Sequence, residues 1–291
     1  MNEVLKINNL SKSFGKTKVL QDFNLTLQQG KVYGLLGKNG EGKTTLIRII
    51  MGVIPCDQGE IKYKNKKINF RDDSYKREIG FIAEESIFYS WMSIKELLNF
   101  NASFYPKWNT RKVDEYLDRL SLDKKTRIRH LSRGMKLKLG LIVTLASEPE
   151  ILLLDDPTSG LDVPTRHDFL KEIIRELSEA GTTILFCTHI VHEIEGIIDN
   201  LGILKFGRLI LDEDFQEIKN SCKRVLLTSD ESLEDKIKID GILSKKANGN
   251  QSEWVVYPWT EEKKQVIENL KPTSMEIKPL NLEEIFISFS S

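Results

Sequence analysis

The stretch KVYGLLGKNGEGKTTLIRII, Lys31 to Ile50, joins a short apolar segment to a periodic one through a glycine-rich loop. The apolar run Lys31–Leu36 predicts a buried strand, and the apolar spacing of residues 43–54 predicts a helix. Between them, Gly37–Thr44 fits the pattern GxxxxGK(S/T), which requires a preceding strand and a following helix. The stretch therefore predicts one strand, loop and helix unit of an α/β protein.

The loop has the chemistry of a polyphosphate site. Glycines let successive backbone amides turn inward, and the start of the following helix adds partial positive charge. Lys43 is expected to reach the β and γ phosphates of a nucleotide, and Thr44 to offer its hydroxyl to Mg²⁺. An ordinary glycine turn is the alternative, but both flanking elements favour the phosphate site. The nucleotide-binding residues predicted here are Asn39, Gly40, Gly42, Lys43, Thr44 and Thr45.

A second stretch, ILLLDDPTSGLD from Ile151 to Asp162, runs from four aliphatic residues directly into two carboxylates. A uniformly apolar strand suits a parallel sheet covered on both faces, and ligands bind beyond the carboxyl ends of such strands. Asp155 is therefore predicted to help hold Mg²⁺, and Asp156 to orient the water that attacks the γ phosphate. The alternative is that the two acids only cap the strand.

Composition limits the classes of protein to which the chain belongs. Its 291 residues, 40% of them hydrophobic, suffice for one large domain plus a small one. Basic and acidic residues number 43 each, so the basic excess typical of nucleic-acid binders is lacking, and no nucleic-acid partner is expected. Three widely spaced cysteines favour reduced thiols. No segment has the length and apolar character of a membrane span, so a separate subunit is expected to supply any such helices.

Hydrophobic patterns divide the rest of the chain into regions. Alternating Phe23, Leu25 and Leu27 predict a half-buried antiparallel sheet within about the first 30 residues. Residues 85–148 have helical periodicity and most of the aromatics, which predicts a helical insertion. The α/β pattern then resumes with strands at 151–155 and 182–189, a helix near 164–180 and a hairpin that turns at Gly207. Beyond about residue 215, predicted strands and one helix indicate a small α+β domain, with strands at 223–229, 241–247 and 252–259 and the helix at 260–270.

Several motifs in one order give the chain a family resemblance. LSRGM, Leu131 to Met135, is similar to the signature LSGGQ of ABC transporter ATPase subunits, and PTSGLD is similar to their D-loop. TTILFCTH resembles the motif that ends in their switch histidine, and SKSFG contains Phe14 at the position of their adenine-stacking aromatic. The resemblance covers residues 1 to about 215. It implies an α/β P-loop NTPase with a RecA-like core, an antiparallel β subdomain and the helical insertion, as an ATPase domain (1–215) followed by the small C-terminal α+β domain (216–291).

The resemblance also implies a composite site that forms in a dimer around ATP and Mg²⁺. Ser132 and Gly134 are expected to donate hydrogen bonds to the γ phosphate held by the opposite subunit. His189 is expected to contact the same phosphate, and Asp162 to connect the two halves. For His189 the alternatives are a core histidine at a strand end, or a metal ligand in HIVH, for which no third ligand is evident.

Three departures from the family pattern concern the phosphate contacts. The signature has Arg133 for glycine and Met135 for glutamine, although Ser132 and Gly134 remain. Glu84, after IGFIA, stands where the family commonly has glutamine. Its charge is expected to help hold Mg²⁺ and to repel the γ phosphate.

A further departure is Asp156, which stands where the family has a catalytic glutamate. Its carboxylate is pulled back by about 1.5 Å, and misplacement on that scale costs on the order of 10²-fold in rate. We therefore expect slow but real hydrolysis. A mixed dimer whose partner supplies a fully equipped second site is the other possibility.

The expected partner is a transmembrane permease, which would hold the chain at the cytoplasmic face of the membrane. Aromatics in IFYSWMSIKELLNFNASFYPKW offer a surface for a helix of that subunit, or else pack within the insertion. FYPKW, LSRGMKLKL and NLEEIFISF are similar to bacterial ABC-2 exporter ATPases of the Ytr type and the phenol-soluble-modulin (peptide) exporter type. The alternative function is a soluble ABC ATPase that acts on ribosomes or DNA. The C-terminal domain is expected to regulate, to support the dimer, or only to brace the fold.

Overall fold

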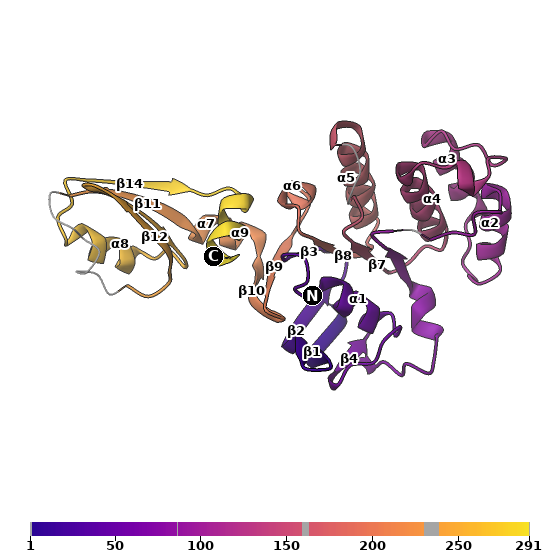
Figure 1. The fold of residues 1–291 in the computed structure, drawn as a ribbon, viewed down its shortest axis with the longest axis horizontal. Coiled ribbons are helices and arrows are strands. Elements are labelled where there is room, and N and C mark those ends of the chain that lie inside the picture. The colour runs from indigo at the N-terminus through magenta and orange to yellow at the C-terminus, as the bar shows by residue number, and fades with distance from the viewer. Residues whose placement is uncertain (1, 86, 159–162, 230–238, 291) are drawn as a thin grey trace. The chain divides into compact units, whose positions relative to one another are not determined.

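The computed structural model describes residues 2–85, 87–158, 163–229 and 239–290, without the side chains of residues 163–169. These residues form two compact units (Figure 1). The first comprises Met1–Ile198 and Leu204–Leu209, and the second comprises Asp199–Ile203 and Ile210–Ser291. The predicted domain boundary after residue 215 is close to this division and stays a prediction.

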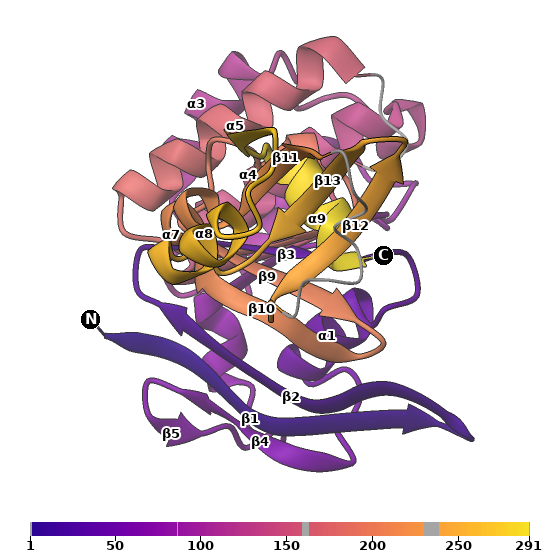
Figure 2. The same cartoon turned by 90° about the vertical axis from the view of Figure 1, so that its left-hand side faces the viewer.

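An antiparallel sheet with the strand order β2-β1-β4-β5 begins the first unit (Figure 2). Phe23, Leu25 and Leu27 are buried in it, as their alternation predicts. The later strands β4 and β5 were not predicted, because they are short and polar and become strands by pairing with β1. The bounds are β1 (Glu3–Phe14), β2 (Thr17–Gln28), β4 (Gln58–Tyr63) and β5 (Lys66–Lys67).

A parallel sheet forms the core, in which four neighbouring strands run in the order β3-β8-β7-β6. Every residue of β3, β7 and β8 is buried, which explains why their sequences are apolar without alternation. The register pairs Leu36 with Thr188 and Asp155 with Cys187, so the carboxyl ends of three strands meet at one edge. The bounds are β3 (Val32–Leu36), β6 (Ile79–Ile82), β7 (Ile151–Asp155) and β8 (Thr183–Thr188).

Helices pack on this sheet. α1 (Lys43–Ile50) contacts β7 and β8, and α5 (Val163–Glu179) contacts β8. α1 is shorter than the predicted helix 43–54, because the chain turns at Gly52 with a φ of 66°. A short helix α6 (Val191–Ile194) follows β8, and a 3-10 helix, η1 (Ser74–Glu78), precedes β6.

The predicted helical insertion lies between β6 and β7. It contains α2 (Ile94–Ala102), α3 (Thr110–Arg119) and α4 (Arg133–Ala146), with a 3-10 turn η2 (Ile128–His130) before α4 (Figure 1). α4 contacts both α2 and α3. The apolar residues of these helices that are buried include Leu97, Val113, Leu117, Leu139 and Ile142.

The hairpin predicted at Gly207 is formed by β9 (Asn200–Lys205) and β10 (Arg208–Asp214). The second unit then has a four-stranded antiparallel sheet with the order β12-β13-β11-β14, and Trp254 and Ile267 lie in its core. The predicted α+β class is confirmed. β14, α7 and α9 were not predicted. The bounds are α7 (Phe215–Ser221), β11 (Lys223–Thr228), β12 (Ile242–Asn248), β13 (Gln251–Val256), α8 (Glu261–Glu268), β14 (Ser274–Pro279) and α9 (Leu282–Ser290).

Candidate functional site

The glycine-rich loop lies between the carboxyl end of β3 and the first residue of α1. Gly42, directly before the helix, has a φ of 115°, and a Cβ there would lie 2.9 Å from the backbone oxygen of Val19. Gly40 has a φ of 87°, also in the left-handed region. Both positions require glycine because of their backbone conformation, and at Gly42 the close approach of Val19 adds a steric reason. The loop thus bends tightly enough to turn its amides inward.

Lys43, the first residue of α1, is held inside this loop. Its Nζ donates a hydrogen bond of 2.8 Å to the carbonyl oxygen of Gly37 and lies 3.5 Å from Asp156 Oδ2. Only 4% of Lys43 is exposed. The ammonium group therefore lies between the loop and the end of β7, where a buried cation attracts an anion strongly.

Asp155 and Thr44 bring two oxygen donors together. Thr44 Oγ1 donates to Asp155 Oδ1 over 3.1 Å, and Asp155 is buried at the end of β7. Burial raises the pKa of Asp155, and the hydrogen bond from Thr44 opposes that rise. Hydroxyl and carboxylate oxygens are ligands that Mg²⁺ prefers. Within the described parts of the chain, no group of three or more His, Cys, Asp and Glu side chains is placed to hold a metal.

Asp156 is joined to His189 by two contacts. Asp156 Oδ1 accepts a 3.0 Å hydrogen bond from the backbone N–H of His189, and it lies 2.7 Å from Nδ1 of the same residue. Asp156 has a φ of 42°, and its own N–H donates to the carbonyl oxygen of Cys187 over 2.8 Å. A proton on Nδ1 that donates to Asp156 leaves Nε2 of a neutral imidazole as an acceptor.

The predicted signature residues begin helix α4. Ser132 is the residue before the helix, and its Oγ accepts a hydrogen bond of 3.3 Å from the N–H of Met135. Ser132 is exposed, while Gly134 is buried. A serine at this position satisfies one unpaired amide at the helix start. The N-terminal end of α4 is therefore capped by an exposed serine.

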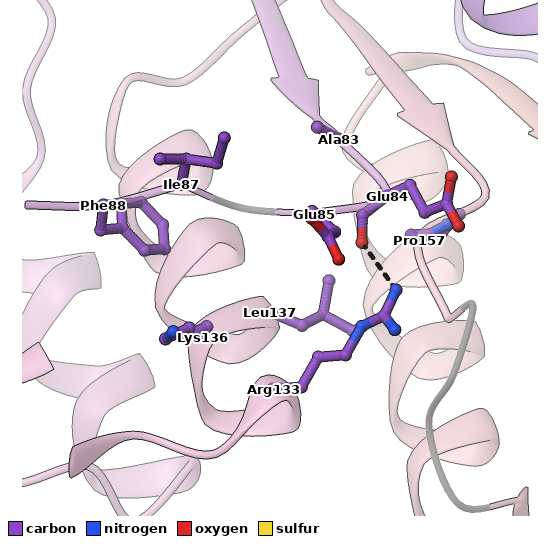
Figure 3. Close-up of a pocket in the computed structure, with 9 residues that line it drawn as sticks. All are labelled: Ala83, Glu84, Glu85, Ile87, Phe88, Arg133, Lys136, Leu137 and Pro157. Atoms are coloured by element: carbon purple, nitrogen blue, oxygen red, sulfur yellow. Dashed lines mark hydrogen bonds between the residues drawn. The ribbon is translucent and has the colours of Figure 1, made fainter. Parts of the chain in front are cut away.

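Glu84 follows β6, and its carbonyl oxygen accepts a hydrogen bond of 3.3 Å from Arg133 Nη2 (Figure 3). In the same view the Glu84 side chain extends away from Arg133. Burial is the largest cause of the raised pKa of Asp155, and the negative charges of Asp156 and Glu84 add to that rise. A cavity of about 360 Å³ opens here, lined by Ala83, Glu84, Glu85, Ile87, Phe88, Arg133, Lys136, Leu137 and Pro157.

Phe14 ends β1 with half of its surface exposed, and Lys12 Nζ lies 5.3 Å from its ring centroid. Asp57 fixes this end of the strand, because its carboxylate accepts hydrogen bonds from Lys12 Nζ (2.8 Å) and from the Ser13 N–H (2.7 Å). The ring is thus held by polar contacts on the strand and has exposed surface for a stacking ligand.

The structure brings Lys43, Thr44, Asp155, Asp156 and His189 together, although 146 positions separate the first from the last. Asp162 lies outside the described residues. Three residues near the site were not predicted from the sequence: Lys12 and Asp57, next to the end of β1, and the buried Glu193. A single glutamate in a four-residue helix has no distinctive sequence pattern, and its burial arises only from tertiary packing.

Comparison with known proteins decides the family. A family model described as "ABC transporter" matches residues 20–159. The ABC transporter ATP-binding protein YtrB of Bacillus subtilis is 32% identical over 285 residues, which are 98% of this chain and 97% of that protein. The chain belongs to the family of ABC transporter ATP-binding subunits.

Other relatives of this ABC subunit agree with that assignment. The bacitracin transport ATP-binding protein BcrA of Bacillus licheniformis is 34% identical, over 78% of this chain and 74% of its own length. The lantibiotic transport ATP-binding protein SrtF of Streptococcus pyogenes is 33% identical, over 75% and 93%. A solved ATP-binding subunit of an ABC transporter superposes with a TM-score of 0.69 at 28% identity, covering 75% of this chain and 92% of that one.

These findings confirm the P-loop NTPase fold and the predicted function, which is ATP binding and hydrolysis coupled to transport. They do not support the ribosomal alternative, because the relatives are named as transport subunits. The expected similarity to Ytr-type ATPases is confirmed, and the similarity to phenol-soluble-modulin exporters stays a prediction. Across the described residues, no helix has both the length and the apolar character needed to cross a bilayer.

Proposed function

We propose that this ABC subunit drives a bacterial exporter by closing as a dimer around Mg-ATP, at the cytoplasmic face of the membrane and bound to a separate permease. The observation that carries the proposal is the group of Lys43, Thr44, Asp155, Asp156 and His189 at the carboxyl ends of β3, β7 and β8. The transport roles named for BcrA and SrtF support a cargo of peptides or antimicrobial compounds.

The chain's own groups suit a bound triphosphate. The loop amides cradle the phosphates, and Lys43 exchanges its contact with the Gly37 carbonyl for the β and γ phosphates. Thr44 and Asp155 would hold Mg²⁺ through their oxygen atoms, and the carboxylate of Glu84 would contribute negative charge. The ion neutralises phosphate charge when it is bound.

Asp156 and His189 act together in hydrolysis. Because Asp156 Oδ1 already accepts from the backbone and ring of His189, the aspartate orients the imidazole so that Nε2 faces the reaction. The second oxygen, Oδ2, is directed to Lys43. A glutamate would carry its carboxylate about 1.5 Å further towards an attacking water, so we propose that this chain hydrolyses ATP slowly.

The second half of the site comes from the opposite subunit. Ser132 is exposed at the start of α4, a helix of 14 residues whose first amides point towards an incoming anion. Phe14, half exposed, stacks on the adenine, and Asp162 connects the two halves. A homodimer completes both sites with identical parts, whereas a sister ATPase supplies a second site of different efficiency.

A cluster of exposed aromatics in the helical insertion is proposed to receive the permease. Tyr89, Trp91, Phe100 and Phe104 are 54%, 61%, 41% and 56% exposed. Their rings contact one another at centroid distances of 5.0 to 6.1 Å. Side chains that only packed within the insertion would be buried, whereas these rings are exposed. Clustered, exposed apolar surface is typical of an interaction site.

Equilibrium binding of Mg-ATP to the purified chain tests the nucleotide site. We expect saturation below millimolar ATP, and loss of binding in Lys43→Ala. Lys38→Ala is the matched control, since Lys38 is an exposed lysine of the same loop. Failure of the unaltered chain to bind Mg-ATP at millimolar concentration would overturn the proposal.

The transport part is tested by purifying the tagged chain from detergent-solubilised membranes. We expect a multi-helix membrane protein to co-purify, and Trp91→Ala with Phe104→Ala to release it while ATP binding persists. Recovery of the chain only with ribosomes or DNA would contradict the exporter assignment.

A further inference from the structure

Glu193 is a buried carboxylate beside the proposed reaction centre. It lies in α6, directly after the turn that carries His189, and only 3% of the residue is exposed. Its Oε2 accepts a short hydrogen bond of 2.6 Å from Thr188 Oγ1. Burial raises the pKa of Glu193 to about 7, and the hydrogen bond from Thr188 opposes the rise.

Thr188 connects Glu193 to both sides of the site. The Thr188 side chain is fully buried, and its Oγ1 also accepts a hydrogen bond of 3.0 Å from the N–H of Ile190. Its carbonyl oxygen accepts from the N–H of Gly37, the first residue of the glycine-rich loop, over 3.3 Å. The Thr188 side chain therefore bonds to Ile190, the residue after His189, and to Glu193 in α6. These two contacts fix the chain on both sides of His189.

We propose that Glu193 is a positioning residue for ATP hydrolysis, which acts through Thr188 to fix the turn that presents His189 to Asp156. The proposal rests on the function proposed above. Glu193 itself does not reach the nucleotide. The Glu193 carboxylate fixes the rotamer of Thr188, and the Thr188 hydroxyl fixes the position of the Ile190 N–H. In the resulting turn, the His189 backbone nitrogen lies 3.0 Å and its Nδ1 2.7 Å from Asp156 Oδ1.

The energetics argue against a purely structural role for Glu193. Burying a carboxylate costs free energy unless hydrogen bonds and a close cation compensate it, and an apolar side chain of similar size commonly serves a core better. Burial is the largest influence on the pKa of Glu193, and the group that donates a hydrogen bond to its carboxylate is the neutral hydroxyl of Thr188. Such a locally unfavourable group is expected where the geometry of a functional site requires it.

The test is a double-mutant cycle on the full chain. Glu193→Ala is expected to lower kcat by about tenfold or more, because it frees the turn to move by a fraction of an ångström. The Kd of Mg-ATP should stay within about twofold, because Lys43 and the loop are intact. Thr188→Val, which keeps the branched shape and removes the hydroxyl, should reproduce the loss. In a His189→Ala background, Glu193→Ala should cost less than about twofold more.

Two further variants give the experiment its controls. Glu193→Gln keeps an oxygen that accepts from Thr188, so it should restore kcat to within about threefold of the unaltered chain. Glu195→Ala removes an exposed carboxylate two residues later and should leave kcat unchanged.

The outcomes separate this inference from the function on which it rests. If the unaltered chain hydrolyses ATP but Glu193→Ala and Thr188→Val keep its kcat, the positioning role is wrong and the ATPase function stands. Fully additive losses in Glu193→Ala with His189→Ala would equally overturn it, since the two residues would then act independently. Absence of hydrolysis in the unaltered chain would instead refute the proposed function.

Discussion

At the scale of single residues, the main feature of the site is a small number of buried charged side chains. Asp155, Asp156, Lys43 and Glu193 are all buried, and each has a hydrogen-bond or ion-pair partner within the site. Buried charges of this kind are costly for the fold, and they concentrate where chemistry needs them.

Lengthening Asp156 by one methylene should accelerate the reaction. Asp156→Glu is expected to raise kcat by about tenfold or more, because its carboxylate extends about 1.5 Å further towards the γ phosphate. Steady-state phosphate release measures the effect. Asp156→Asn, which keeps the length and removes the charge, should instead lower kcat. An unchanged or lower rate in Asp156→Glu would show that the contact with His189, rather than reach, determines the rate.

Glu193 should make stability depend on pH. Its pKa rises from 4.5 to about 7 on folding, so the folded chain binds the proton more tightly. Stability therefore falls as the pH rises from about 4.5 to 7, by about 3 kcal/mol, and stays low above it. The titratable groups that act on the pKa of Glu193 are Asp156 after β7, His189 after β8 and Lys171 in α5. The negative charge of Asp156 adds to the rise that burial causes.

Glu193→Gln removes this titration. Urea unfolding at pH 5 and pH 8 should show the variant gaining stability over the unaltered chain at the higher pH. Glu195→Gln is the matched exposed control and should follow the unaltered chain. An equal difference between Glu193→Gln and the unaltered chain at both pH values would contradict the burial argument.

At the scale of elements, close packing joins the helical insertion to the sheet. β6 contacts α4, and a Cβ on Gly80 would lie 2.3 Å from Thr144 Cγ2 and 3.0 Å from Pro149 Cγ. Since protein interiors are densely packed, neither neighbour has room to yield fully. The small residue in β6 is therefore required by α4 and by the loop before β7.

Gly80→Ala should destabilise the chain by about 1 to 3 kcal/mol, because the added methyl overpacks this contact. Thermal or urea unfolding measures the loss. Thr144→Ser removes the methyl group that the new Cβ meets, so the double variant should recover part of the stability. If the single variant is as stable as the unaltered chain, β6 and α4 pack less closely than described.

The contact between the end of β1 and Asp57 should affect the affinity for the adenine base of ATP. Asp57→Ala releases Lys12 and the Ser13 N–H, so we expect the Kd of ATP to rise about threefold to tenfold, for a loss near 1 kcal/mol. Binding of tripolyphosphate, which has no base to stack on Phe14, should not change. Fluorescence titration with ATP and with tripolyphosphate separates the effect on adenine binding from any effect on phosphate binding. Equal weakening of both would point to a general loss of structure.

At the scale of the whole molecule, the proposal requires a second subunit to complete each site. Ser132 is exposed at the start of α4, so its hydroxyl is accessible from outside the chain. The dimer is therefore expected to depend on the nucleotide. Its formation should follow occupancy of the site.

Light scattering of Asp156→Asn should report this dimer. With Mg-ATP, slow hydrolysis should preserve the closed state and double the scattering mass, while the same protein without nucleotide stays monomeric. Ser132→Arg should prevent the doubling by filling the phosphate position, with ATP binding retained. A monomer under all these conditions would favour a sister ATPase as the natural partner.

The sequence by itself determined the elements whose patterns are local. GKNGEGKTT predicts its loop because glycine backbone freedom and the lysine act within nine residues, and ILLLD predicts a buried strand because both faces of the sheet are covered. The order of these motifs also sufficed to predict the family and the fold. The short β4 and β5 were missed because their polar residues become strands only through pairing with β1.

Only the tertiary structure decided which distant residues meet. His189 contacts Asp156 because β7 and β8 are adjacent and in register, and Asp57 reaches Lys12 because the loop before β4 runs beside β1. Burial of Glu193 likewise arises from the packing around α6. Side-chain contacts, desolvation and the pKa values they shift depend on distances in space, which spacing along the chain does not specify.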